Sequence, residues 1–153
     1  MIRFVGDFRG CRIYLASPFF SSDQIDRLLR VSKVLRQMGF KVWSAYEDGI
    51  VVSNKSKEED MEKAFQENIK RIDECELVVG ITDGKDMGTI FEMGYAYAKG
   101  KPIIGYAETL RDKPFNLMLA RSCYGVAKNL EELRNVLIKF VTGEECEKVT
   151  NIE

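Results

Sequence analysis

Five short apolar segments alternate with longer amphipathic segments along this chain, and this alternation restricts its fold more than any other feature. The short segments predict strands at residues 12–16, 41–44, 77–81, 102–106 and 124–127. Segment 77–81 is apolar almost throughout, which is typical of a strand that is buried on both faces of a parallel sheet. Because helical segments separate the strands, we expect right-handed crossovers and parallel strand pairing.

The intervening segments carry apolar residues at helical spacing together with the end signals of helices. The first predicted helix begins at a capping box formed by Ser21 and Gln24 and ends before Gly39. Asn129 is the predicted N-cap of the last helix. The other predicted helical segments are 58–74, 87–99 and a short turn at 115–121.

We therefore predict one α/β domain over residues 1–153, a flavodoxin-like or Rossmann-like fold with about five parallel strands and helices on both faces. The core of this domain spans about residues 11–141. Residues 47–57 are expected to form a mobile loop, and the polar tail 142–153 is expected to fray. Residues 1–10 either add an edge strand or frame the entrance of the site.

The absence of histidine excludes several kinds of chemistry. It removes Ser-His-Asp and Cys-His catalysis and histidine metal sites. The 23 basic and 24 acidic residues give a net charge of −1, so we expect no nucleic-acid or membrane partner. No apolar run approaches the length of a membrane span, and residues 1–12 lack the apolar stretch of a signal peptide. We expect a cytoplasmic protein with reduced thiols at its four scattered cysteines, Cys11, Cys75, Cys123 and Cys146.

The segment that follows the third predicted strand carries two acidic residues near the start of a helix. Asp86 stands at the N-cap position, and Glu92 lies about one and a half turns inside the helix. The helical neighbours of Glu92 are the small residues Gly88, Thr89 and Ala96, which leave room for a ligand above the carboxylate. A partly buried carboxylate beside open space can act as a nucleophile. Acidic residues at these positions also stabilise helices without any further role.

Four further residues and one segment are unusual for their context. Tyr14 lies near the end of the first strand, where it either belongs to the core or donates a hydrogen bond to a carboxylate in the crevice. Phe19 and Phe20 follow in the next loop and either stack on a planar ring or pack on the next helix. Asn68 interrupts the apolar stripe of its helix, so a backbone group or a polar ligand should bind its amide. Segment 115–119 is apolar for a connection, which points to a subunit contact.

Three motifs together resemble the nucleoside 2-deoxyribosyltransferase family. Segment 13–20 resembles the family's opening strand and loop, and segment 86–96 resembles its D-x-G-T-x-x-E-x-G-x-A signature. Segment 113–118 resembles its N-L-M loop, and the similarity extends over about residues 12–140. The resemblance implies transfer of 2-deoxyribose between nucleobases with retention, without a metal or organic cofactor.

The resemblance also implies roles for individual residues. Glu92 matches the nucleophile that attacks C1′, Tyr14 the residue that orients it, and Asp86 a carboxylate that holds sugar hydroxyls and assists at the base. Phe19 matches an aromatic residue that packs against the base. Asn116 and Met118 match the loop that completes a neighbouring subunit's site, which implies a homo-oligomer. Asn68 departs from the pattern, because many members have Asp there and an amide cannot donate a proton as a general acid.

Two other functions use the same residues. A nucleoside 5′-monophosphate N-glycosidase would keep the nucleophile but needs a phosphate site, for which Ser17 and Arg121 are the candidates. A nucleotide sensor would bind its ligand without turnover. The expected partners are small nucleosides and nucleobases in each case.

Overall fold

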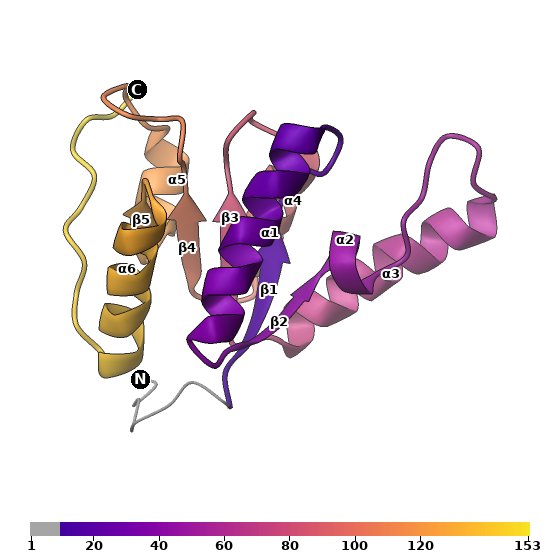
Figure 1. Cartoon of the computed structure of the whole chain (residues 1–153), viewed down its shortest axis with the longest axis horizontal. Coiled ribbons are helices and arrows are strands. Elements are labelled where there is room, and N and C mark those ends of the chain that lie inside the picture. The colour runs from indigo at the N-terminus through magenta and orange to yellow at the C-terminus, as the bar shows by residue number, and fades with distance from the viewer. Residues whose placement is uncertain (1–9) are drawn as a thin grey trace.

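The computed structural model describes residues 10–153, which form a five-stranded sheet flanked by helices (Figure 1). The strand order is β2-β1-β3-β4-β5, and every neighbouring pair is parallel, which confirms the predicted α/β class. In chain order the elements are β1 (Arg12–Ala16), α1 (Ser22–Gln37), β2 (Lys41–Ser44), α2 (Ala45–Asp48), α3 (Glu58–Glu74), β3 (Leu77–Ile81), α4 (Met87–Ala98), β4 (Ile103–Tyr106), α5 (Leu117–Ser122), β5 (Gly125–Ala127) and α6 (Leu130–Thr142).

Helices cover both faces of the sheet because its inner strands are apolar on both sides. Ile13 and Leu15 of β1 belong to one core cluster, together with buried residues of α1 and α6. Tyr14 and Ala16, which point the other way, belong to a second cluster with residues of α3 and α4. Figure 1 shows α1 and α6 on one side of the sheet and α3, α4 and α5 on the other.

The strand order places a crevice between β1 and β3. From β1 the chain passes outward to β2, and from β3 it passes in the opposite direction to β4 and β5. Connections that diverge in this way leave an opening at the carboxyl ends of the two strands, where ligands bind in doubly wound folds. The loops after Ala16 and Ile81 leave the sheet at this opening.

A glycine in β3 lets α4 approach the sheet closely. A Cβ at Gly80 would lie 2.3 Å from Sδ and 2.7 Å from Cγ of Met93. Met93 is buried and belongs to α4, so its side chain occupies the space that a larger residue at position 80 would need. Glu92 directly precedes Met93 in α4, so the close approach also brings Glu92 toward β1.

The helix ends follow the sequence signals. Gln24 N–H donates to Ser21 Oγ at 3.2 Å, and Gln24 Oε1 accepts from Phe20 N–H at 2.7 Å, one residue earlier than in a standard capping box. Gly39 ends the first helix with φ of 103°, a conformation that glycine adopts without strain. Asn129 Oδ1 accepts from Glu132 N–H at 2.8 Å, as predicted for the last helix.

The segment predicted to be a mobile loop begins with a helix instead. Residues Ala45–Asp48 form α2, and the carboxylate of Glu47 accepts from the hydroxyls of Ser32 and Ser44, both at 2.8 Å for Oε2. These bonds tie α2 to α1 and β2, which a reading of local composition does not reveal. The prediction of a loop is confirmed only for residues 49–57.

The prediction that residues 142–153 fray is wrong for the end of that tail. Phe115 N–H donates to Asn151 O at 2.9 Å, and Glu153 N–H donates to Phe115 O at 2.9 Å. Val149 and Ile152 pack against the cluster that contains Phe115. The tail is held because its two apolar residues and its backbone find partners on a distant loop.

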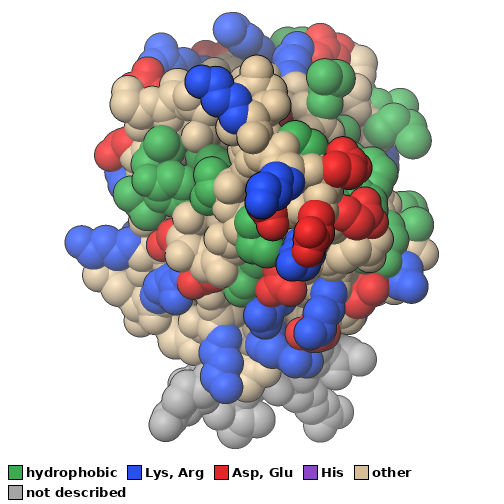
Figure 2. Space-filling view, turned by 90° about the vertical axis from the view of Figure 1, so that its right-hand side faces the viewer, with side chains coloured by type: hydrophobic (Ala, Val, Ile, Leu, Met, Phe, Trp, Pro, Cys, Tyr) green, Lys and Arg blue, Asp and Glu red, His purple; other side chains and the backbone are tan. Residues whose placement is uncertain are grey.

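The remaining surface features add little to the position of the site. Figure 2 faces the side of the molecule beyond β2, where basic and acidic side chains are interspersed between apolar patches. In the part of the chain from residue 10 onward, no helix is long and apolar enough to cross a membrane. The two alternatives for residues 1–10 concern residues that, apart from Gly10, lie outside the described structure.

Candidate active site

The centre of the candidate site is a contact between Tyr14 of β1 and Glu92 of α4. The Tyr14 hydroxyl donates a hydrogen bond to Glu92 Oε2 across 78 positions of sequence. Tyr14 is 1% exposed, so its phenol cannot rotate into solvent. The structure therefore brings together residues from two of the three motifs, at the opening between β1 and β3.

Burial controls the protonation of this pair. Removal from solvent is the main reason that the pKa of Glu92 rises from 4.5 to about 7. The hydrogen bond from Tyr14 lowers that pKa, and the negative charge of Asp86 raises it. The pKa of Tyr14 is also raised, first by burial and then by the charge of Glu92, so its hydroxyl keeps its proton and remains a donor. Near neutral pH the Glu92 carboxyl is balanced between a neutral and an ionised form.

Asp86 caps the helix that carries Glu92, as predicted. Its Oδ2 accepts from both the backbone N–H and the hydroxyl of Thr89, each at 2.8 Å. Thr89 is buried, so the capping contact is fixed. A Cβ at Gly88 would lie 3.4 Å from Asp86 Oδ2, so glycine keeps the approach to this carboxylate open. Within the described residues Oδ1 takes part in no hydrogen bond and can accept one from a ligand.

The loop after β1 carries Ser17 and Phe19 to the same edge of the sheet. Ser17 Oγ donates to the carbonyl oxygen of Pro18 at 3.0 Å. The Phe19 ring lies 5.5 Å from the ring of Tyr46 and 6.1 Å from that of Phe20, measured between centroids. Phe19 thus packs toward α2, and Phe20 is 82% exposed.

Asn68 is less buried than its position on the apolar stripe predicted, and the alternative of a backbone partner is wrong. It is only half-buried in α3, and its side chain makes no hydrogen bond to any described residue. The stripe that predicted burial is broken because α3 runs past the edge of the sheet, where only Ala64 and Ile72 are buried. A half-exposed amide needs no protein partner, because water can bind it.

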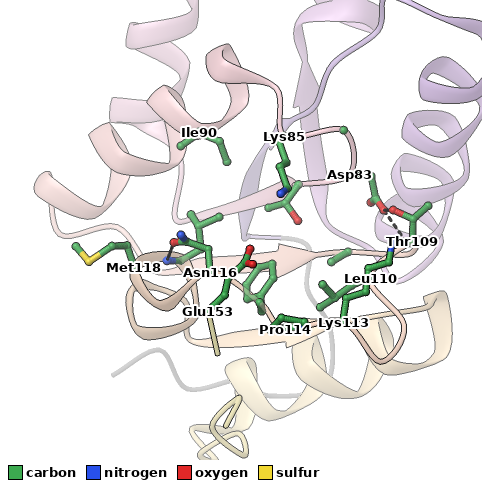
Figure 3. A pocket seen from close by; sticks show the side chains of 15 residues that line it. Asp83, Lys85, Ile90, Thr109, Leu110, Lys113, Pro114, Asn116, Met118 and Glu153 are labelled. Atoms are coloured by element: carbon green, nitrogen blue, oxygen red, sulfur yellow. Dashed lines mark hydrogen bonds between the residues drawn. The ribbon is translucent and has the colours of Figure 1, made fainter. Parts of the chain in front are cut away.

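The third motif lies beside a separate cavity. This cavity has a volume of about 540 Å³ and lies at the carboxyl ends of β3 and β4 (Figure 3). Asn116 and Met118 line it together with Lys85, Lys113 and Glu153, whereas Tyr14, Asp86 and Glu92 do not. Asn116 caps α5 by accepting from Leu119 N–H at 3.1 Å, and Met118 is 75% exposed. The structure does not bring the third motif to the Tyr14–Glu92 contact of the same chain.

Ion pairs hold the loop that leads to this third motif. Glu108 accepts from Arg30 Nη1 at 2.6 Å and from Arg27 Nε at 3.1 Å. The hydrogen bond from Arg30 is the main cause that lowers the pKa of Glu108 to about 2. Buried Asp83 accepts from the backbone N–H of Thr109 at 2.7 Å. These contacts fix the start of the loop 107–116 against α1 and β3.

Trp43 is a neighbour of the central pair that the sequence patterns did not indicate. Its ring stacks on that of Tyr14, with centroids 5.4 Å apart and an angle of 26° between the planes. Trp43 is the one tryptophan of the chain, and it faces Tyr14 because the two residues are register partners in β2 and β1. The alternation within segment 41–44 was a possible signal, since it places Trp43 on the face opposite Val42 and Ser44.

Comparison with known proteins shows the family to which this chain belongs. A model of the family described as nucleoside 2-deoxyribosyltransferase matches residues 13–134, which include all three motifs. The chain belongs to the nucleoside 2-deoxyribosyltransferase family. Membership of this family indicates an enzyme that acts on nucleosides, by transfer or by cleavage of the glycosidic bond. No curated protein matches the sequence of this chain.

Solved structures share the fold of this family member. The 2-deoxyribosyltransferase of Bacillus psychrosaccharolyticus is 25% identical, with a TM-score of 0.76 over 89% of this chain and 99% of that one. A conserved protein of Enterococcus faecalis V583 is 19% identical, with a TM-score of 0.58 over 84% and 87% of the two chains. The CMP N-glycosidase BcmB of Clostridium botulinum is also 19% identical, with a TM-score of 0.57 over 84% and 98%. The last two likenesses concern the fold alone.

Proposed function

We propose that this chain is a nucleoside 2-deoxyribosyltransferase that moves 2-deoxyribose between nucleobases through a covalent intermediate on Glu92. The observation that carries the proposal is the hydrogen bond from buried Tyr14 to Glu92 at the opening between β1 and β3. Tyr14 occupies Oε2, so Oε1 is the oxygen available for attack. Family membership and the likeness to a transferase at 25% identity support transfer as the reaction.

The reaction follows from two displacements at one carbon. In the first, Glu92 attacks C1′, the C1′–N bond breaks, and the base leaves with the electron pair, taking a proton from Asp86, from water or by tautomerisation. In the second, a nitrogen of the incoming base attacks C1′ from the face that the first base left. The ester bond breaks, its electrons return to Glu92, and the incoming base releases a proton. Two inversions give net retention.

A base-exchange assay tests the proposal. Deoxyinosine and adenine are incubated with the protein, and a parallel reaction contains deoxynucleoside 5′-monophosphates without an acceptor base. We expect deoxyadenosine and hypoxanthine in the first reaction, separated by chromatography. Free base from the monophosphates alone would instead establish the N-glycosidase, and no product in either reaction would contradict both enzymatic functions.

The phosphate site that an N-glycosidase needs has no support in the side-chain contacts. Arg121 Nη1 donates to Val149 O at 2.9 Å, so the tail engages this guanidinium. Ser17 Oγ is directed at the carbonyl of Pro18. Each candidate for binding a 5′-phosphate therefore already makes one hydrogen bond within the chain, and these contacts do not by themselves identify a phosphate site.

We expect Tyr14→Phe to slow base exchange without abolishing it. The variant keeps the buried ring but removes one hydrogen bond to a charged group, and the expected fall in kcat is about 10- to 100-fold. Steady-state kinetics measure it, with circular dichroism as the check that the fold is retained. A kcat equal to that of the wild type would show that Tyr14 does not orient the nucleophile.

The pH profile should report the ionisation of Glu92. Below about pH 7 the carboxyl is neutral and cannot attack C1′, so kcat/KM should fall by about tenfold per pH unit on the acid side and level off above pH 7. Because the Tyr14 hydrogen bond lowers the pKa of Glu92, Tyr14→Phe should move this limb to higher pH. An acid limb near pH 4.5 would contradict a buried nucleophile.

The third motif is proposed to complete the site of a neighbouring subunit, as the family resemblance implies. Asn116→Ser keeps a capping oxygen for α5 but changes the group offered to a neighbour. If sites are shared, mixing inactive Asn116→Ser with inactive Glu92→Gln should restore activity, because some sites then combine an intact Asn116 with an intact Glu92. Kinetics after subunit exchange measure this. Activity that persists in a demonstrated monomer would contradict the shared site.

A further inference from the structure

Tyr14 lies in a column of stacked side chains that reaches the edge of the sheet. The Trp43 ring covers one side of the Tyr14 ring at 5.4 Å. The guanidinium carbon of Arg71 lies 5.6 Å from the centre of the Trp43 ring. Arg71 is itself held by Glu67, whose Oε1 lies 2.9 Å from Nε. Three elements, α3, β2 and β1, therefore contribute one residue each to the column.

The position of β2 explains why Tyr14 depends on this column. β2 is an edge strand, so a ring on β1 has sheet neighbours on the β3 side and only β2 on the other. A hollow beside Trp43, lined by Arg12, Lys41 and Glu74, shows that the packing is incomplete there. Without the indole, the Tyr14 ring would have free space on this side, and its hydroxyl could move away from Glu92.

From these contacts we infer that Trp43 is a positioning residue for the proposed transfer reaction. Its indole, held in place by Arg71, fixes the Tyr14 ring so that the hydroxyl keeps its hydrogen bond to Glu92. Trp43 acts through Tyr14 and has no contact with the reacting carbon in this role. The inference rests on the proposed function for its catalytic consequence, whereas the chain of contacts from Trp43 to Glu92 is independent of the reaction.

A double-mutant cycle tests whether Trp43 acts through the Tyr14 hydroxyl. Trp43→Leu should lower kcat about tenfold with little change in KM, and Trp43→Phe should restore most of the loss. In the Tyr14→Phe background, Trp43→Leu should have less than about a twofold further effect, because the hydroxyl that it positions is already absent. An equal loss in both backgrounds would overturn the inference and leave Trp43 a purely structural role.

A second aromatic pair provides the matched control. Tyr124, which directly precedes β5, and Phe140 of α6 contact each other edge to face at 5.4 Å, in the core cluster on the other face of the sheet from Tyr14. Phe140→Leu also removes an aromatic contact and should lower the melting temperature. It should leave the acid limb of the pH profile in place, whereas Trp43→Leu should move that limb to higher pH. A shift of the limb in Phe140→Leu would show that general loosening of the fold explains both results.

Fluorescence separates this inference from the proposed function. Because Trp43 is the one tryptophan, its emission should change as Glu92 ionises, with a midpoint near pH 7. Asp86, the N-cap of α4, is the charged neighbour of Glu92. The charged and titratable groups beside Trp43 are Arg12 of β1, Lys41 of β2, Arg71 and Glu74 of α3, and Cys75 after α3, and Glu92→Gln leaves all of these in place. The transition should therefore disappear in Glu92→Gln. If the wild type shows this change in emission but no base exchange, the proposed function is contradicted and the inference stands. If the wild type shows no change in emission, the inference is overturned.

Discussion

Glu92→Gln is expected to lower kcat for base exchange by about 10⁴-fold or more, because an amide cannot form the ester to C1′. Glutamine keeps the size of the side chain and can still accept the hydrogen bond from Tyr14. The loss should therefore come from the missing nucleophile. Rapid quenching of wild-type enzyme with a 2′-deoxynucleoside, followed by mass spectrometry, should find a deoxyribosyl group on the peptide that contains Glu92. The variant should show no such adduct.

Stability measurements separate this effect from misfolding. In the unfolded chain Glu92 releases its proton at lower pH than in the folded chain, so the wild type should lose up to about 3 kcal/mol of unfolding free energy between pH 4.5 and about 7. Glu92→Gln lacks this loss and should be at least as stable as the wild type at pH 8. Base exchange retained in Glu92→Gln would refute the assignment of Glu92 as the nucleophile. A nucleotide sensor would show two results together: Glu92→Ala would bind nucleosides with unchanged affinity, and the wild type would form no adduct.

Gly80→Ala is expected to lower both stability and activity, because the new methyl group would meet Met93 in the core. The added Cβ would lie within 2.8 Å of three side-chain atoms of Met93, which is 1% exposed. Overpacking of this kind costs about 1–3 kcal/mol of unfolding free energy. We expect the strain to move α4 away from β3 as Met93 repacks, which would draw Glu92 away from Tyr14 and lower kcat by about tenfold or more.

Two variants of the same helix control for this prediction. Gly94→Ala makes the same substitution where nothing lies within 4 Å of the new Cβ, so it should stabilise α4 by about 0.5–1 kcal/mol. Met93→Ala alone should be destabilising, but in combination with Gly80→Ala the new methyl group occupies part of the vacated space. The double variant should therefore lose less unfolding free energy in urea than the sum of the two single losses. A simple sum would show that the two residues do not compete for the same space.

Sequence patterns predicted the elements of this fold because each depends on neighbours in the chain. The apolar run Leu77–Ile81 indicated a central strand, and Ser21, Gly39 and Asn129 indicated helix ends through bonds to residues three positions away. Asp86 as the cap of α4 was predicted for the same reason. The prediction that the tail frays was wrong because Ile152 pairs with Phe115, a residue distant in sequence that local composition cannot associate with it.

The candidate site also combines features that the sequence predicted with features that depend on the tertiary structure. Spacing placed Asp86 and Glu92 on one helix with small neighbours, and the family motifs assigned roles to them and to Tyr14. Packing in three dimensions settled the rest: Gly80 lets α4 approach, parallel pairing of β1 with β3 brings Tyr14 to Glu92, and the same packing excludes water and raises the pKa of the carboxyl. The stack of Trp43 on Tyr14 also required the register of two strands. Helical periodicity is encoded within a few residues, whereas burial and the contacts of a carboxylate depend on segments that only folding brings together.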